Sequence, residues 1–126
     1  LKPGALQYLL NLKNKGIKIG LATSNSMNLL TVTLKSNNAF ELFDSITITD
    51  EVKKSKSNPD IYLLAAKKLN VDPSECMVFE DIIAAARGAK LAGMKVTGVF
   101  DEHSKHQTDI LKEECDNYIY NYEDLI

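Results

Sequence analysis

The chain has 126 residues, and we expect residues 1–126 to form a single domain with its own apolar core. Its formal net charge of -2 gives no reason to expect nucleic acid or an anionic membrane as a partner. No apolar run approaches the roughly 18 residues that are needed to span a bilayer.

The residues that most often bind transition metals do not form a recognisable site. Cys76 and Cys115 are far apart and match no metal-binding spacing. His103 and His106 have no partner at such a spacing either, and we expect both on the surface. Two isolated cysteines fit a reduced, cytoplasmic setting better than a secreted one.

Helix-type and strand-type segments alternate along the chain. An amphipathic helix is predicted from Pro3 to Lys15, before Gly16, and a strand from Ile17 to Ala22. Further helices are predicted near residues 26–35, 59–70, 82–92 and 108–115, and further strands at 45–49, 76–79, 95–100 and 117–120. This alternation predicts an α/β fold with a doubly wound, mostly parallel sheet between helix layers.

Two adjacent carboxylates, Glu80 and Asp81, follow a short apolar strand and precede a helix of small residues that stops at Gly93. Ligands of open α/β sheets bind beyond the carboxyl ends of the strands, which is where this pair lies. Neighbouring acids repel each other unless a cation or a proton lies between them, and their oxygens suit Mg²⁺. The alternative is that Glu80 and Asp81 only cap the following helix, whose dipole favours negative charge.

A cluster of hydroxyl and amide side chains, Thr23, Ser24 and Asn25, follows the strand at residues 17–22. A helix begins directly after it, and Asn25 or Ser26 is the expected N-cap. Free backbone N–H groups and hydroxyls at such a position can bind a phosphate. Capping alone is the other interpretation of the cluster.

Three lysines precede the helix that is predicted to begin at Pro59, with Asn58 as its expected N-cap. A lysine just before a helix N-terminus lies near the carboxyl end of a strand if the topology is doubly wound. Lys56 is therefore a candidate phosphate-binding residue, whereas Lys53 and Lys54 are expected to be solvated.

Taken in order, Thr23-Ser24-Asn25, then Lys56 before Pro59-Asp60, then Glu80-Asp81, this chain resembles the haloacid dehalogenase-like hydrolases. It is most similar to their beta-phosphoglucomutase-like branch, and the resemblance covers essentially the whole chain. Each motif alone is weak, and it is their order and spacing that carry the resemblance.

The chain departs from the family pattern at several positions. Ser57 replaces a proline of the third motif, and Ile82 and Ala85 stand where the fourth motif usually has Ser and Gly. Ile82 removes a hydroxyl beside the expected metal site. The family's Asp-x-Asp strand, whose first Asp is the nucleophile, has no counterpart among the 126 residues, and neither has the cap domain. We therefore expect the chain to be the carboxyl-terminal part of a larger protein.

The resemblance implies a magnesium-dependent phosphatase or phosphohexomutase that acts on a small phosphorylated metabolite through a phospho-aspartate. It implies that Glu80 and Asp81 bind Mg²⁺. It also implies that Lys56, the Thr23 hydroxyl and the backbone N–H groups of Ser24 and Asn25 hold the phosphate. Without the nucleophile, this chain alone is expected to be inactive and to bind Mg²⁺ weakly.

The resemblance places the absent strand in the middle of the sheet, between the strands at residues 17–22 and 77–79. Unpaired central edges seek partners. We expect either that these two strands close onto each other or that a second molecule fills the gap by self-association. A monomer with an open gap would contradict both expectations.

Two other classes of function fit parts of the pattern. A signalling receiver domain has a similar length, an acidic Mg²⁺ site, a Thr or Ser and a Lys, but its acidic pair comes early in the chain, whereas Glu80 and Asp81 come late. A non-catalytic module that keeps the sheet as a scaffold is the second alternative, because a fold does not guarantee chemistry.

Overall fold

The computed structural model describes residues 2–126 and shows the expected alternation of helices and strands. The strands are β1 (Gly20–Thr23), β2 (Ser45–Ile48), β3 (Met77–Glu80), β4 (Lys95–Val99) and β5 (Asn117–Ile119). The α-helices are α1 (Ala5–Asn14), α2 (Met27–Ser36), α3 (Asp60–Leu69), α4 (Ile83–Leu91) and α5 (Thr108–Glu114). Short 3₁₀ helices lie at η1 (Phe40–Leu42), η2 (Thr49–Glu51), η3 (Pro73–Glu75), η4 (Glu102–Gln107) and η5 (Tyr122–Leu125).

The strands pair in parallel, as the α/β prediction requires, but they form two sheets rather than one. β1 pairs with β2, and β4 lies between β3 and β5. In the first sheet Thr23 lies opposite Ile48, and in the second Glu80 lies opposite Gly98. β1 therefore ends at Thr23 and β3 at Glu80. These are the two strand ends at which the sequence predicts a phosphate site and a metal site.

The prediction that β1 and β3 close onto each other is wrong, because within residues 2–126 neither strand pairs with the other. Two clusters of buried apolar residues form instead. One gathers around Leu30, Leu34 and Ala39, and the other around buried residues of α3, α4, β4 and α5. α3 contacts β1 and β2 while it contributes to the second cluster, so helices bury apolar side chains of both sheets without direct pairing of β1 with β3.

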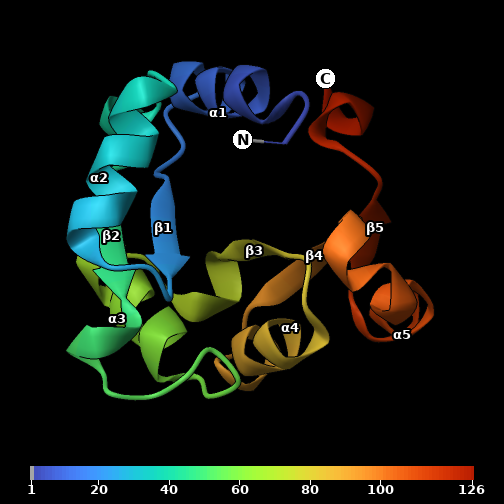
Figure 1. Ribbon diagram of the computed structural model, residues 1–126. Coiled ribbons are helices and arrows are strands. Elements are labelled where there is room, and N and C mark those ends of the chain that lie inside the picture. Colours follow the sequence, from blue (N-terminus) through green and yellow to red (C-terminus); the bar gives the residue numbers. More distant parts are fainter. Residues whose placement is uncertain (1) are drawn as a thin grey trace.

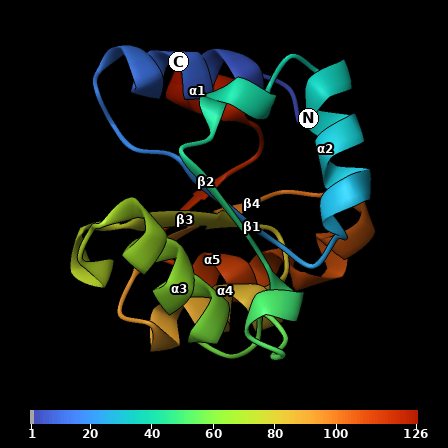
Figure 2. The ribbon, with the colours of Figure 1, turned by 90° about the vertical axis from the view of Figure 1, so that its left-hand side faces the viewer.

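Helices cover the strands on two sides (Figures 1 and 2). Figure 2 shows α1 on one side of the strands and α3, α4 and α5 on the other. α3 contacts β1 and β2, and α4 contacts β3 and β4. α1 contacts both η1 and η5 and so links the beginning of the chain to both parts of the molecule. None of the helices in the described part of the chain has the length and hydrophobicity needed to cross a membrane.

The ends of the helices follow from particular residues. The Ser26 side chain accepts a hydrogen bond from the N–H of Leu29 and is the N-cap of α2, one of the two residues predicted for that position. Asn70, at the end of α3, has a left-handed backbone conformation, with φ of 56°. Gly93 ends α4 with φ of 86°, a conformation that glycine adopts without steric cost.

Candidate active site

Lys56 and Glu80 form an ion pair at the carboxyl end of β3, although they are far apart in the sequence. The Lys56 ammonium contacts Oε2 of Glu80. The Glu80 side chain is 9% exposed and that of Lys56 20% exposed. A carboxylate buried to this degree needs an opposite charge and hydrogen bonds to offset its lost hydration. Two of the predicted site residues are therefore in direct contact.

Tyr62, in the first turn of α3, is the second partner of Glu80. Its hydroxyl donates a hydrogen bond of 2.7 Å to Oε2 of Glu80 and lies 3.0 Å from the carbonyl oxygen of Ala85. The Lys56 ammonium lies 5.9 Å from the centre of the Tyr62 ring, within the range of a cation–π interaction. Desolvation by burial, followed by the neighbouring charge of Glu80, raises the pKa of Tyr62 far above its ordinary value, so this phenol stays protonated.

Close packing against α4 holds the backbone around Lys56 in place. Gly88 is buried in α4, and a Cβ atom there would overlap the carbonyl oxygen of Lys56 and lie 3.0 Å from that of Asn58. Asn58 does not cap α3 with its side chain, contrary to the prediction. Its amide instead lies 3.4 Å from the carbonyl oxygen of Ser55, within its own loop, and Pro59 directly precedes α3.

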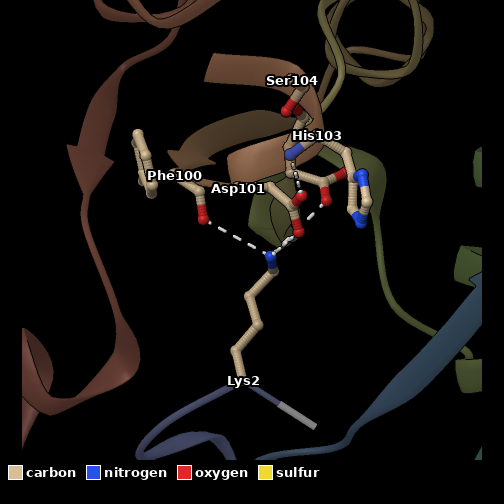
Figure 3. A network of polar contacts seen from close by, with 6 residues as sticks. Lys2, Phe100, Asp101, His103 and Ser104 are labelled. Carbon is tan, nitrogen blue, oxygen red and sulfur yellow. Dashed lines mark hydrogen bonds and ion pairs between the residues drawn. The ribbon is translucent and has the colours of Figure 1, made fainter.

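Asp81 follows β3 and belongs to a second set of charges, of which Figure 3 labels Lys2 and Asp101. Its carboxylate lies 3.6 Å from the ammonium of Lys2. Lys2 also pairs with Asp101 and lies 3.4 Å from the carbonyl oxygen of Phe100 at the end of β4. The hydrogen bond from Lys2, together with one from the N–H of His103, holds the pKa of Asp101 below its usual range. Lys2 thus connects the start of α1 to the ends of β3 and β4.

Side chains of η4 fix the connection from Asp81 to α4. The Ser104 hydroxyl donates to the carbonyl oxygen of Asp81 at 2.7 Å. The Gln107 side-chain oxygen accepts from the N–H of Ile83, the first residue of α4, at 2.8 Å. Helix capping, the alternative interpretation of Glu80 and Asp81, is therefore not observed, because Gln107 serves that N–H group. Glu80 instead contacts Lys56 and Tyr62, and Asp81 lies beside Lys2.

Tyr122 of η5 adds an aromatic wall beside the acidic pair. Its ring lies 5.5 Å from that of Phe79 and 5.9 Å from that of Tyr8, measured between centroids. Desolvation, and then the charges of Asp81 and Glu80, raise the pKa of Tyr122 to about 12. The phenol is therefore neutral at physiological pH and adds no charge to this part of the site.

The hydroxyl and amide cluster lies at the end of β1. The Thr23 hydroxyl accepts a hydrogen bond of 3.1 Å from the N–H of Asn25, which is the local geometry expected of a strand-to-helix turn. Ser24 and Asn25 are exposed. Among the contacts within residues 2–126, none joins Thr23 directly to Lys56 or the acidic pair, so the convergence of this cluster on the same ligand stays a prediction.

The carboxylate oxygens of Glu80 and Asp81, at the end of β3, are of the type that binds Mg²⁺. Mg²⁺ is bound through one or two carboxylates, with water and substrate oxygens completing its coordination, and Glu80 and Asp81 supply two such groups. The described residues bring together no group of three or more His, Cys, Asp and Glu side chains that could hold a metal ion by themselves. His103 and His106 are exposed, as predicted.

Comparison with known proteins supports what the order of the three motifs predicts. Residues 1–93 match the family of haloacid dehalogenase-like hydrolases. The chain belongs to this family. Membership confirms the resemblance inferred from the motifs and excludes the signalling receiver domain.

Similar proteins include one named as a phosphatase and one named as a phosphoglucomutase. The chain is 45% identical over 94 residues to YhcW and 40% identical over 99 residues to beta-phosphoglucomutase, both from Bacillus subtilis (strain 168). These alignments cover 75% and 79% of this chain but only 43% of either relative. The crystal structure of CbbY from Rhodobacter sphaeroides in complex with xylulose-(1,5)bisphosphate superposes with a TM-score of 0.90 at 28% identity, over 99% of this chain and 56% of that one. This chain therefore spans about half the length of the proteins it matches.

No sequence motif identifies several residues of the site. Tyr62 follows Ile61 on α3, and both are buried, so its position is typical of a core aromatic residue. Lys2 lies near the start of the chain, and Asp101 in a polar loop. A signal for Asp101 does exist, because it follows β4 and so lies at the same sheet edge as Asp81.

Proposed function

We propose that this chain forms part of the core of a magnesium-dependent phosphatase or phosphohexomutase that acts on a small phosphorylated metabolite. The observation that carries the proposal is the contact of Lys56 and Tyr62 with Glu80, directly beside Asp81 at the carboxyl end of β3. It supports the proposal because it places an ammonium and two carboxylates at the sheet edge where ligands of α/β proteins bind.

Each residue has a role in this proposal. Glu80 and Asp81 would hold Mg²⁺, which supplies positive charge against the oxygens of the transferred phosphoryl group. Lys56 would neutralise phosphate charge, and the Thr23 hydroxyl with the N–H groups of Ser24 and Asn25 would hold phosphoryl oxygens. The nucleophilic aspartate would come from a segment outside the 126 residues, since these contain no Asp-x-Asp sequence.

The substrate class rests on relatives and not on this site. Beta-phosphoglucomutase and the complex of CbbY with xylulose-(1,5)bisphosphate both point to phosphorylated sugars. Phosphatase and mutase differ in whether water or a sugar hydroxyl receives the phosphoryl group. The proposed chemistry of the core residues is the same in both cases.

Turnover measurements test the proposed function. The coding sequence upstream of Leu1 is read, and the whole encoded protein is compared with this chain on a panel of sugar phosphates with and without Mg²⁺. We expect the whole protein to release or move phosphate only with Mg²⁺, and Asp81→Asn to lower kcat by at least about 100-fold. We expect this chain alone to show no turnover, because it lacks a nucleophile.

Two outcomes would contradict these expectations. Turnover by this chain alone would show that the assignment of the nucleophile is wrong. A whole protein that is folded and binds Mg²⁺ yet turns over no phosphate ester would favour the non-catalytic scaffold. Lys54→Met is a suitable control variant, because Lys54 is exposed and has no role in the proposal.

We also propose that isolated copies of this chain associate through the free edges of β1 and β3. The supporting observation is that each strand pairs on one side only within the described residues. Free strand edges bind further strands. Sedimentation velocity on the isolated chain should therefore show a concentration-dependent dimer, and a strict monomer at all concentrations would refute the proposal.

A further inference from the structure

The Tyr62 hydroxyl is a polar group in the core whose position is fixed from several sides. Tyr62 is only 2% exposed. Tyr62 belongs to the larger apolar core, as do Ile61, Ala66 and Ala86. A buried hydroxyl is costly unless it is hydrogen-bonded, and apolar packing alone would be served equally well by phenylalanine. The hydroxyl at this position is therefore not explained by packing alone.

A phenol has one proton to donate, and two acceptors lie near it. The Oε2 atom of Glu80 is 2.7 Å away and the carbonyl oxygen of Ala85 is 3.0 Å away. The carboxylate is the stronger acceptor because it is charged, so the proton points to Glu80. The burial of the ring then limits where the hydroxyl can lie.

Both partners of Glu80 contact the same carboxylate oxygen. The Tyr62 hydroxyl donates a hydrogen bond to Oε2, and the Lys56 ammonium forms an ion pair with that oxygen. Among residues 2–126, no hydrogen bond is formed with Oε1. An ion pair and a hydrogen bond on one oxygen oppose rotation of the carboxylate about its last bond. Oε1 keeps its acceptor capacity for a ligand.

We propose that Tyr62 is a positioning residue that, together with Lys56, holds Oε2 of Glu80 and so presents Oε1 alone to a divalent cation. This inference rests on the proposed function, because it requires that Glu80 takes part in binding the metal. Tyr62 itself does not touch the metal or the substrate. It acts through the direction in which it holds the carboxylate.

The test measures the affinity of this chain for Mn²⁺, used as a paramagnetic substitute for Mg²⁺ and followed by water-proton relaxation. The variants are Tyr62→Phe, Glu80→Gln and the two combined, with Tyr118→Phe as the matched control. Tyr118 is a partly buried tyrosine on β5, and its hydroxyl contacts Thr108 and not Glu80. Each variant is measured well below its own thermal unfolding temperature.

We expect Tyr62→Phe to weaken Mn²⁺ binding about tenfold and Tyr118→Phe to leave it unchanged. In the Glu80→Gln background the additional loss from Tyr62→Phe should vanish, because Tyr62 acts only through Glu80. A purely structural role of the hydroxyl would give the same loss in both backgrounds. A second measurement needs no variant: the hydroxyl proton of Tyr62 should exchange slowly and shift when Mg²⁺ is added.

The outcomes separate this inference from the function on which it rests. Two results would contradict the role of Tyr62 without affecting the proposed metal site. One is a folded Tyr62→Phe variant that binds Mn²⁺ as tightly as the wild type. The other is a loss of Mn²⁺ affinity from Tyr62→Phe that is equally large in the Glu80→Gln background. If neither Glu80→Gln nor Asp81→Asn changes Mn²⁺ binding, the metal site of the proposed function fails and the inference fails with it.

Discussion

Replacing Gly88 with alanine should lower the free energy of unfolding by about 2–3 kcal/mol. Two effects oppose each other at this position. Alanine is the better helix former by about 1 kcal/mol. Its Cβ, however, would overlap the carbonyl oxygen of Lys56, which is backbone and cannot move without displacing the whole loop. We expect the overlap to dominate, and urea unfolding followed by circular dichroism measures the result.

Gly93→Ala is the matched control for this change. Gly93 follows the same helix and has a positive φ, but a Cβ there would meet no atom within 4 Å. Its cost is the backbone strain alone, about 1 kcal/mol. Equal losses in the two variants would contradict the tight contact between Gly88 and the Lys56 loop. A Gly88→Ala variant that is more stable than the wild type would contradict it more strongly.

Replacing Lys56 with methionine should lower the free energy of unfolding by about 3 kcal/mol. The change removes the positive charge but keeps most of the aliphatic stem. The Glu80 carboxylate, 9% exposed, would then lose its cation and keep the Tyr62 hydroxyl as its remaining partner. An unpaired buried charge is expensive, and the same urea titration at neutral pH measures the cost.

Two further variants show whether the loss comes from the unpaired charge. Lys54→Met, in an exposed position of the same loop, should change stability by less than about 0.5 kcal/mol. Combining Lys56→Met with Glu80→Gln should recover much of the loss, because the uncompensated charge is then gone. If Lys56→Met changes stability as little as Lys54→Met, the ion pair with Glu80 does not stabilise the fold.

Local patterns were enough to predict the elements and their parallel pairing. The alternation of Ile46, Thr47 and Ile48, for example, marks β2, and Ser26 marks the start of α2. These features depend on residues close together in the chain. The split into two sheets could not be predicted in the same way, because it depends on how two separate cores bury their side chains.

The same holds for the site: its main residues could be predicted from nearby sequence, but their partners could not. Lys56, Glu80 and Asp81 could be proposed from the ends of elements at which they lie. The partners that hold them come from other elements: Tyr62 from α3, and Lys2 from the segment before α1. Asn58 was wrongly expected to cap α3, since its side chain turns to Ser55 in its own loop. Partner choice of this kind depends on the packing of α3, α4 and the loop between β2 and α3, which no single window of sequence contains.

In the proposed function, three separated clusters converge on one magnesium and phosphate site. This convergence can be tested by mapping the relaxation that Mn²⁺ causes in the backbone amide signals of this chain. We expect the amides around Glu80, Lys56 and Asn25 to lose intensity first and Asp81→Asn to remove the effect. Loss of intensity centred on other acidic residues, with these three regions unaffected, would contradict it.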